Sequence, residues 1–509
     1  MKSIKMRGVV AAVSGALLFG FGANAMADST TDIVNALVAK GVLADNEAEL
    51  ILKGSKAQKE AEVKAAKHKE FDFINSDAPF KYETKLAGHD ADVQVYGVID
   101  IGVARQNHSL PANSSLPNNL YPYQGASKGL GSQTAWINGG LQDSRIGLKG
   151  GISLFEAMDN KFKFIYQFEA GFNPLTAELN NAAKTVAQNS PTKVSVNADS
   201  SLNGELFARQ AWVGIDGGSL GKLSYGTQYN PFYEITGAYD PNGKADTFSP
   251  LGESGAIGGG GGISENSRMK NSLKYANTFA APMEGKVNIA GMYQFGNASG
   301  NVDHGYGLTG QIGYENNLFG VQFAYDKFTN SLKATNSATY NTIKLLTYDT
   351  DAVLLAAKWT PTKDLTFSGG WEWYKLSNAS DTTATLNPGS VFGYSVSQIA
   401  DGLTSGDSQD VNIYFGGVKF DFAERVPMLA GLTTSLGYYA TRADEWSGSS
   451  PTTNSKKASV DTWTFIADYK LNKRFDTYFA YTTNHFSGPA YSTNESNVDT
   501  VGAGLRMKF

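Results

Sequence analysis

The residues best suited to acid–base or nucleophilic chemistry are few in this sequence and far apart. Histidine occurs five times and cysteine is absent. The histidines are His68, His89, His108, His304 and His485. The His-Glu-x-x-His motif of zinc peptidases does not occur. We therefore expect no enzyme, no catalytic residue, no cofactor and no bound metal.

Charged side chains that could act on passing ions lie instead in segments where polar and apolar residues alternate. From Lys161 to Phe172, aromatic residues fill most alternate positions, and Lys161, Lys163, Gln167 and Glu169 lie on the opposite face. A period of two is typical of a β-strand with lipid on one side and water on the other. By this parity, five basic side chains are expected to face water: Arg145, Lys149, Lys161, Lys163 and Lys222.

The elements that must position these side chains are strands. The alternation recurs from Asp92 to Phe509, in about sixteen runs separated alternately by short turns and long polar loops. No stretch after the N-terminus supplies the roughly 18 apolar residues of a transmembrane helix, and the mean hydropathy is -0.28. The sequence predicts an all-β fold, a transmembrane antiparallel β-barrel enclosing an aqueous channel. A β-sandwich is the alternative, but it would not require aromatic residues on an outer face.

The first 90 residues differ from the remainder. Cationic residues, an apolar run from Val9 to Phe21 and the ending Ala25-Met26-Ala27 predict a signal peptide over residues 1–27. Residues 28–90 have apolar residues at helical spacing and a Lys/Glu/Ala-rich run, which favours a short helical extension. A partly disordered periplasmic segment is the alternative. Removing the signal peptide leaves 40 basic and 48 acidic residues, 40 − 48 = −8, which gives no support to nucleic-acid binding.

The alternating region resembles the general bacterial porins of the β-proteobacterial type. The resemblance covers about residues 92–509, and it implies a porin barrel over residues 91–509. The resemblance does not cover the helical extension, because standard members of that family lack such a segment. The similar segments, in order, are Val95–Gly102, Ser144–Gly150, Tyr166–Phe172, Leu206–Gly214, Gly221–Tyr229 and Asn271–Tyr275.

The resemblance also implies a constriction loop at about residues 229–269, because in that family the corresponding loop folds into the barrel and narrows it. Arg209 is placed on the basic wall of the pore by the resemblance alone. Loop carboxylates that face a basic wall would create a transverse field that orients dipolar solutes. The candidate loop acids are Glu234, Asp240, Asp246 and Glu253.

A porin of this type is expected to let small hydrophilic solutes and ions diffuse passively across the lipid of a Gram-negative outer membrane. The resemblance implies a homotrimer, and the terminal Phe509 is similar to the signal that the barrel-assembly machinery recognises. Two alternatives remain open. One is a substrate-specific channel, and the other is a barrel that mainly tethers the envelope through a periplasmic contact of residues 28–90.

Overall fold

The computed structural model describes residues 38–40, 44, 46, 49, 53, 78–107, 132–175, 177–180, 206–207, 209–253, 268–295, 306–336, 343–378, 408–423, 425–444, 457–488 and 497–509. The chain divides into two compact units, Met1–Asp72 and Phe73–Phe509. In the first unit, Val38, Ala39, Asn46, Glu49 and Lys53 are helical, and the side chains of Glu49 and Lys53 form an ion pair of 2.8 Å. The predicted signal peptide and most of the predicted extension lie outside the described residues. No helix within the described ranges is long and apolar enough to cross a membrane.

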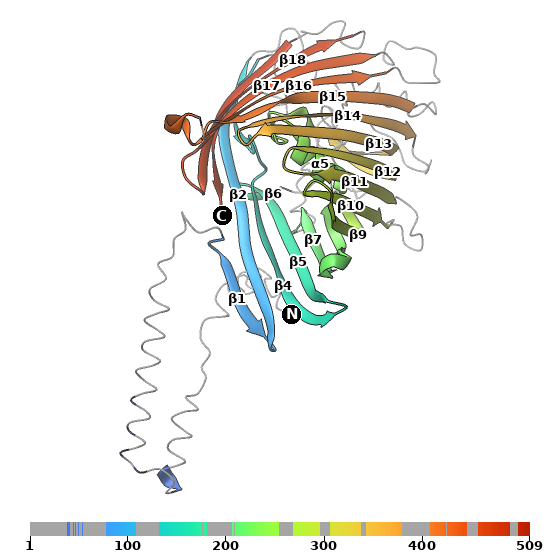
Figure 1. Cartoon of the computed structure of the whole chain (residues 1–509). Coiled ribbons are helices and arrows are strands. Elements are labelled where there is room, and N and C mark those ends of the chain that lie inside the picture. The colour runs from blue at the N-terminus through green and yellow to red at the C-terminus, as the bar shows by residue number, and fades with distance from the viewer. Residues whose placement is uncertain are drawn as a thin grey trace, which may run out of the picture. The chain divides into compact units, whose positions relative to one another are not determined.

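The second unit is a closed antiparallel barrel of 16 strands, as the alternation predicts (Figure 1). The barrel closes because β19 pairs with β2. Three shorter strands, β1 (Lys81–Leu86), β3 (Gln133–Asn138) and β6 (Glu178–Asn180), pair with barrel strands. The barrel strands are β2 (His89–Gln106), β4 (Arg145–Ala157), β5 (Asn160–Asn173), β7 (Gln210–Asp216), β8 (Lys222–Tyr229), β9 (Arg268–Ala281), β10 (Gly285–Gln294), β11 (Gly307–Glu315), β12 (Phe319–Asn336), β13 (Ile343–Thr362), β14 (Leu365–Asn378), β15 (Ser408–Asp421), β16 (Leu432–Ala443), β17 (Ala458–Lys470), β18 (Phe475–Ser487) and β19 (Asn497–Lys508).

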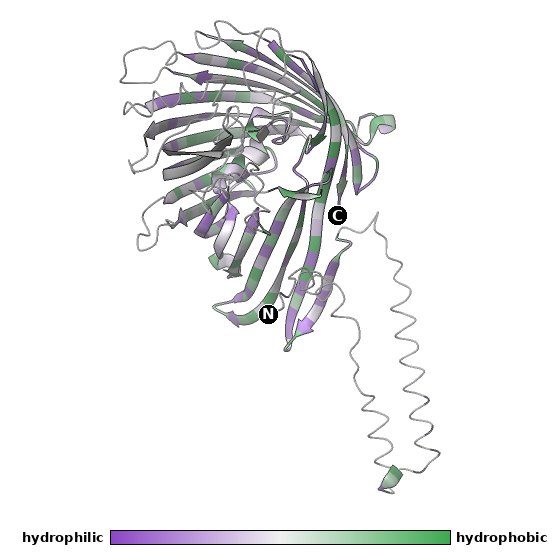
Figure 2. Cartoon of the chain, turned by 180° about the vertical axis from the view of Figure 1, so that it is seen from behind, coloured by the Kyte–Doolittle hydropathy of each residue, from purple (hydrophilic) through white to green (hydrophobic). Residues whose placement is uncertain are grey.

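The two faces of each strand have different surroundings. On β12, Val321 and Phe323 are 42% and 43% exposed, whereas Gln322 and Ala324 are 3% and 0% exposed. Successive side chains of a strand point to opposite faces, so one set faces outward and the other packs inside the barrel. The alternation of hydrophilic and hydrophobic residues along the strands is visible in Figure 2. The outward face is therefore the apolar one, as in a barrel surrounded by lipid.

The two ends of the barrel differ in the length of their connections. Short turns join β4 to β5, β13 to β14 and β17 to β18, whereas long segments separate β2 from β4, β14 from β15 and β16 from β17. In outer-membrane barrels the short turns are periplasmic and the long loops extracellular. We call these the turn end and the loop end.

The C-terminal residue completes the closure of the barrel. Phe509 and Gly97 exchange two backbone hydrogen bonds of 3.0 and 2.9 Å. The Phe509 ring makes an edge-on contact with Phe80, with ring centroids 5.9 Å apart. Beyond this point β1 takes over as the neighbour of β2, from Lys81 opposite Gln94 to Leu86 opposite His89. Strand structure therefore begins before residue 91.

The segment after β8 folds into the barrel. The Asn230 side chain accepts a hydrogen bond from the Tyr233 amide, and Pro231 fits the first helical turn, so α5 (Pro231–Tyr239) starts here. Phe232, Ile235 and Tyr239 on α5 are buried in one cluster with inward-facing residues of β12–β16. A second short helix, α6 (Pro250–Glu253), follows. This inner loop therefore lies inside the barrel.

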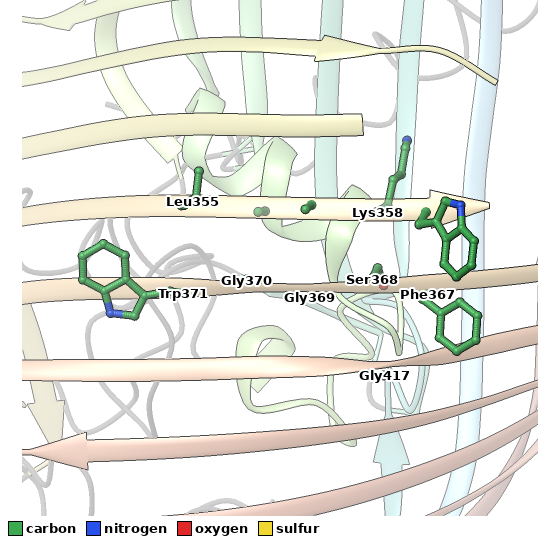
Figure 3. Close-up of a pocket in the computed structure, with 11 residues that line it drawn as sticks. Leu355, Lys358, Phe367, Ser368, Gly369, Gly370, Trp371 and Gly417 are labelled. Carbon is green, nitrogen blue, oxygen red and sulfur yellow. The ribbon is translucent and has the colours of Figure 1, made fainter. Parts of the chain in front are cut away.

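The outward wall of β13–β15 contains an apolar depression of about 640 Å³ (Figure 3). Leu355 and Trp371 border it on the side of the loop end, and Trp359 and Phe367 border it on the side of the turn end. Between these pairs lie small residues, because Ala357 is opposite Gly369 and Gly369 is opposite Gly416. Because glycine and alanine occupy these positions, no large side chain fills the space between the aromatic residues.

Candidate pore constriction

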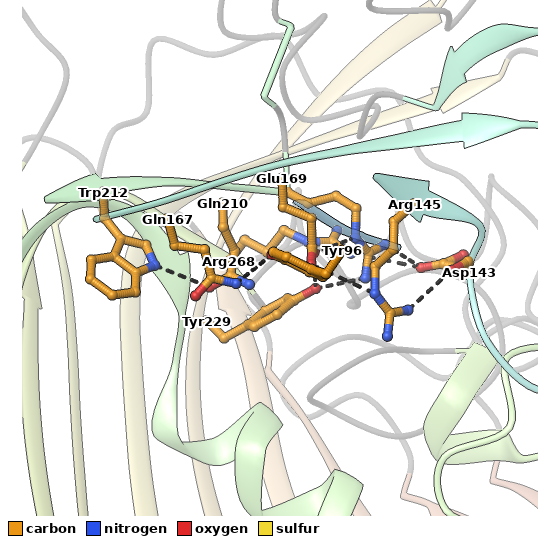
Figure 4. A network of polar contacts seen from close by, with 10 residues as sticks. Tyr96, Asp143, Arg145, Gln167, Glu169, Gln210, Trp212, Tyr229 and Arg268 are labelled. Atoms are coloured by element: carbon orange, nitrogen blue, oxygen red, sulfur yellow. Dashed lines mark hydrogen bonds and ion pairs between the residues drawn. The ribbon is translucent and has the colours of Figure 1, made fainter. Parts of the chain in front are cut away.

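Arg209 is the centre of a polar network on the inner wall, and its partners Asp143, Glu169 and Tyr229 are labelled in Figure 4. It lies just before β7 and is 6% exposed. Its Nε donates to Glu169 Oε1 at 2.8 Å and its Nη1 to Asp143 Oδ2 at 2.5 Å. Its Nη2 donates to the Tyr229 hydroxyl at 2.6 Å. The guanidinium of Arg209 thus joins the start of β7 to β5, to β8 and to the segment between β3 and β4. These three hydrogen bonds fix the position of Arg209 in the wall.

Two further arginines share the same carboxylates. Arg145 Nε lies 3.6 Å from Glu169 Oε2, and Arg268 Nη2 lies 3.8 Å from Asp143 Oδ2. Their side chains are 21% and 20% exposed, so both are partly accessible to solvent. Burial would raise the pKa of the Asp143 carboxyl, but Arg209 and Arg268 outweigh it and hold that pKa well below its usual range. Three guanidinium groups therefore surround two ionised carboxylates.

Neutral hydrogen-bonding groups extend the network toward the turn end. The Tyr96 hydroxyl donates to Glu169 Oε2 at 2.9 Å and accepts from Gln167 Nε2 at 2.6 Å. The ammonium of Lys149 lies 5.1 Å from the centre of the Tyr96 ring, and this lysine is exposed. Lys149 thus adds a solvated positive charge that lies nearer the turn end than the arginines. Nearby, Trp212 Nε1 donates to Gln210 Oε1 at 3.2 Å (Figure 4).

Stacked aromatic rings connect the arginines to the inner loop. Tyr229 and Tyr233 stack with ring centroids 4.5 Å apart. Arg268 lies 5.5 Å from the centre of the Tyr229 ring, and the ammonium of Lys244 lies over the Tyr233 ring. Burial, Arg268 and Arg209 lower the pKa of Lys244 well below its ordinary value. Loop and wall together therefore form one cationic and aromatic surface.

The four candidate acids of the loop have different environments. Glu234 forms an ion pair of 2.7 Å with Lys274 on β9, and the Asp246 side chain is hydrogen-bonded to Asp143. Asp240 is buried and accepts hydrogen bonds from Ser249 Oγ, the Asn242 and Lys244 amides and the Tyr439 hydroxyl. Asp240 thus anchors the loop and does not face the lumen. Glu253 ends α6, and its side chain lies outside what the structure describes.

The six candidate basic residues also separate into two groups. Arg145, Lys149 and Arg209 belong to the network or border it. Lys161 pairs with Glu156 at 3.3 Å beside the β4–β5 turn, and Lys222 pairs with Asp216 at 3.5 Å beside the β7–β8 turn. Lys163 is exposed on β5, opposite Asp216 on β7. These three lysines lie at the turn end, away from the arginines.

Sequence reasoning did not select several members of the constriction: Tyr96, Asp143, Glu169, Tyr229, Lys244, Arg268 and Lys274. The sequence contains a signal for two of them. Glu169 has the inward parity of Lys161 and Lys163, and Arg268 stands where the chain returns from the inner loop to a strand. Asp143 has no such signal, because it lies in the irregular segment between β3 and β4.

The described residues contain no group of three or more His, Cys, Asp or Glu side chains that could hold a metal ion. The donors gathered at the constriction are guanidinium, ammonium and phenol groups, which bind anions by charge and hydrogen bonds. What this arrangement can do chemically is therefore to attract, orient and pass solutes.

Comparisons with known proteins identify the family of the chain and structures that are similar to it. Residues 86–489 match the family model described as Gram-negative porin. The chain is 23% identical over 448 residues to an outer membrane porin protein of Bordetella pertussis, covering 82% of this chain and 95% of that protein. Among solved structures, the anion-selective porin from Comamonas acidovorans has a TM-score of 0.52 and 16% identity, covering 82% of this chain and 100% of the other. The trimer form of OmpT, an outer membrane protein of Vibrio cholerae, has a TM-score of 0.48 and 11% identity, covering 82% of this chain and 99% of the other.

Proposed function

Because the chain belongs to the Gram-negative porin family and lies in the outer membrane, we propose that its lumen lets small hydrophilic solutes and ions diffuse passively into the periplasm. We infer a channel and not an enzyme. The 16-strand barrel with an inner loop supports this role, since a barrel of this size leaves an aqueous path that a folded loop narrows.

We further propose that the constriction prefers anions. The observation that carries this proposal is the group of arginines at the inner wall. In the described part of the chain, Arg145, Arg209 and Arg268 form ion pairs with Asp143 and Glu169, and Asp246 is hydrogen-bonded to Asp143. The exposed Lys149 adds a further positive charge. An excess of fixed positive charge in a narrow, low-dielectric pore raises the local concentration of anions. The anion-selective porin from Comamonas acidovorans, which has the same fold, supports this reading.

Single-channel recording in a planar bilayer tests both proposals. The refolded protein is expected to give stable, ohmic current steps. Under a salt gradient, the reversal potential is expected to have the sign of chloride permeation. Correctly folded, heat-modifiable barrels without any conductance would overturn the open-channel proposal. Conductance with a cation-type reversal potential would overturn only the anion preference. Concentration-dependent block of the current by one solute class would favour a substrate-specific channel instead.

The homotrimer is also a proposal, supported by the family resemblance. Its measurement is the mass of the detergent-solubilised protein before and after heating, together with closures in groups of three. We also propose that residues 1–27 are removed on export and that residues 28–90 make a periplasmic contact. Deleting residues 28–77, before the described β1, is expected to leave conductance unchanged and to weaken attachment of the barrel to the cell envelope. Unchanged attachment would contradict the tethering role.

A further inference from the structure

One row of inward-facing residues crosses four neighbouring strands on the inner wall. Gln94 on β2 is opposite Lys149 on β4, Lys149 is opposite Gln167 on β5, and Gln167 is opposite Trp212 on β7. We call these four residues the luminal row. The row lies nearer the turn end than the arginines, because Lys149 follows Arg145 by two inward positions on β4. Neighbouring strands are about 4.8 Å apart, so Lys149 and Trp212 are separated by about 10 Å along the row.

Trp212 points into the barrel, and a hydrogen bond fixes its indole. The next residue, Val213, belongs to the exposed outward face, and successive side chains of a strand alternate. The indole Nε1 donates to Gln210 Oε1 at 3.2 Å (Figure 4). Gly226 is directly opposite Trp212, and Gly214 is the next inward position on β7. From these two positions no side chain can cover the indole.

The indole of Trp212 also has no aromatic neighbour of its own. Tyr229 and Tyr233 stack on each other, whereas no ring of the described residues stacks on Trp212. The side chain is partly exposed to solvent. A face of a large aromatic ring is therefore available to a solute that passes through the lumen.

At the other end of the row, Lys149 carries a positive charge that is held in place by Tyr96. The Tyr96 hydroxyl is hydrogen-bonded to Glu169 and Gln167, and its ring lies against Gly147, where any Cβ would collide with it. The Lys149 ammonium lies 5.1 Å from the centre of this ring, at the distance of a cation–π contact. In the part of the chain that the structure describes, no carboxylate forms an ion pair with Lys149. Its charge is therefore available to an anion.

The two ends of the row match the two parts of an aromatic carboxylate. A carboxylate forms a charge-assisted hydrogen bond with an ammonium group. An aromatic ring is attracted to an indole in stacked or edge-on contact, with ring centroids 4.5–7 Å apart. A small inorganic anion would use only Lys149, and a neutral sugar would use only Trp212. A solute with a ring next to its carboxylate uses both.

We propose that Lys149 and Trp212 form a binding site for aromatic carboxylates in the lumen, between the arginines and the periplasm. This inference rests on the proposed channel function and adds to it a preferred class of solute. The arginines attract every anion by charge, whereas the luminal row selects among anions by the aromatic ring. Gln167 lies between the two ends and keeps the intervening wall neutral.

The test is block of the chloride current through the refolded full-length protein in a planar bilayer. The probes are benzoate, cyclohexanecarboxylate and glucose. Cyclohexanecarboxylate has the charge and nearly the size of benzoate but no aromatic ring. In wild type, benzoate is expected to reach half-block at a concentration about 2- to 12-fold lower than cyclohexanecarboxylate, the range for one aromatic pair. Glucose is expected to give no comparable block.

Substitutions at the two ends of the row separate the ring from the charge. W212L is expected to abolish the difference between benzoate and cyclohexanecarboxylate, and W212F is expected to keep most of it. The control W371L changes a tryptophan on the outward face and should keep the wild-type ratio. K149Q is expected to weaken the block by both carboxylates severalfold, whereas K222Q, at the β7–β8 turn, should not. K149Q keeps the test decisive if W212L does not fold, because Lys149 is exposed.

The outcomes distinguish this site from the channel itself. Normal chloride conductance with equal block by benzoate and cyclohexanecarboxylate in wild type would overturn the site and leave the channel proposal intact. Comparable block by glucose would overturn the requirement for a carboxylate. Wild-type benzoate block in both W212L and K149Q would also overturn the site. Folded wild-type barrels without chloride conductance would overturn the channel and the site together.

Discussion

Tyr439 on β16 donates a hydrogen bond to the carboxylate of Asp240 in the inner loop, although 199 residues separate the two in the sequence. The same hydroxyl is the acceptor for Asn242 Nδ2 at 3.0 Å. Burial raises the pKa of the Asp240 carboxyl, and its hydrogen bonds oppose that rise. The contact thus joins the loop to the wall opposite its origin, and the width of the constriction depends on it.

Replacing Tyr439 by Phe is expected to loosen the inner loop. A buried carboxylate that loses a hydrogen-bond donor costs about 1–3 kcal/mol, and here that cost falls on the docked position of the loop. Single-channel recording should show noisier currents and more frequent voltage-induced closures. The neighbouring Tyr438→Phe is the control, because Tyr438 faces outward toward Asp461. Identical current traces for the two variants would contradict an anchoring role for Tyr439.

Arg268→Gln is expected to move ion selectivity toward cations. A unit charge about 4 Å from an ion contributes roughly 1 kcal/mol in water-like surroundings, which corresponds to a change of up to about five-fold in the permeability ratio. The reversal potential under a salt gradient measures this change. Lys222→Gln, at the β7–β8 turn, is expected to have little effect. If the two variants shifted the reversal potential equally, the arginines would not control selectivity.

Lys244 should make anion preference depend on pH below its ordinary pKa of 10.5. Burial, Arg268 and Arg209 lower its pKa below the ordinary 10.5, whereas Asp143 and Asp240 oppose the shift. The ammonium is charged below the lowered pKa and loses its charge as pH rises through it, so anion preference should fall before pH 10.5. In the same window the unfolded chain binds the proton that the folded chain has released, so stability should rise with pH.

The comparison that checks this prediction is Lys244→Met against wild type. The variant is expected to show a flatter dependence of the reversal potential on pH than wild type, because it lacks the titrating ammonium. Lys222→Met, at the turn end, should keep the wild-type profile. A wild-type profile in K244M would assign the titration to another group.

Phe509→Ala is expected to impair assembly of the barrel in cells and to change the stability of the folded barrel little. In the folded barrel the Phe509 ring contacts Phe80, an interaction worth about 0.5–1.5 kcal/mol beyond its buried area, and its backbone bonds to Gly97 remain in the variant. Spontaneous refolding into vesicles is therefore expected to change little, whereas assembly in cells should fall severalfold. The fraction of heat-modifiable protein measures both. Met507→Ala, outward on the same strand, is the control, and equal assembly of both variants would argue against a terminal signal.

The sequence by itself determined the strands and their faces. A period of two in polarity is a local property of extended backbone, since successive side chains point to opposite sides whatever the remainder of the chain does. For that reason the strands near Lys161, Leu365 and Arg474 could be predicted, as could the approximate number of strands and the inward direction of Arg145 and Lys149.

Only the tertiary structure decided which charged residues meet. Asp143, Arg209 and Arg268 come from three separate segments, and closure of the barrel together with the folded-in loop brings them within ion-pair distance. Parity could not distinguish Lys161, beside a turn, from Arg145, at the constriction, because both face inward at different heights. It also could not identify Asp240 as a buried anchor, since its partner Tyr439 is supplied by a strand that the local sequence does not specify. Height along the barrel and contacts across it depend on strand register, which is fixed by pairing between distant segments.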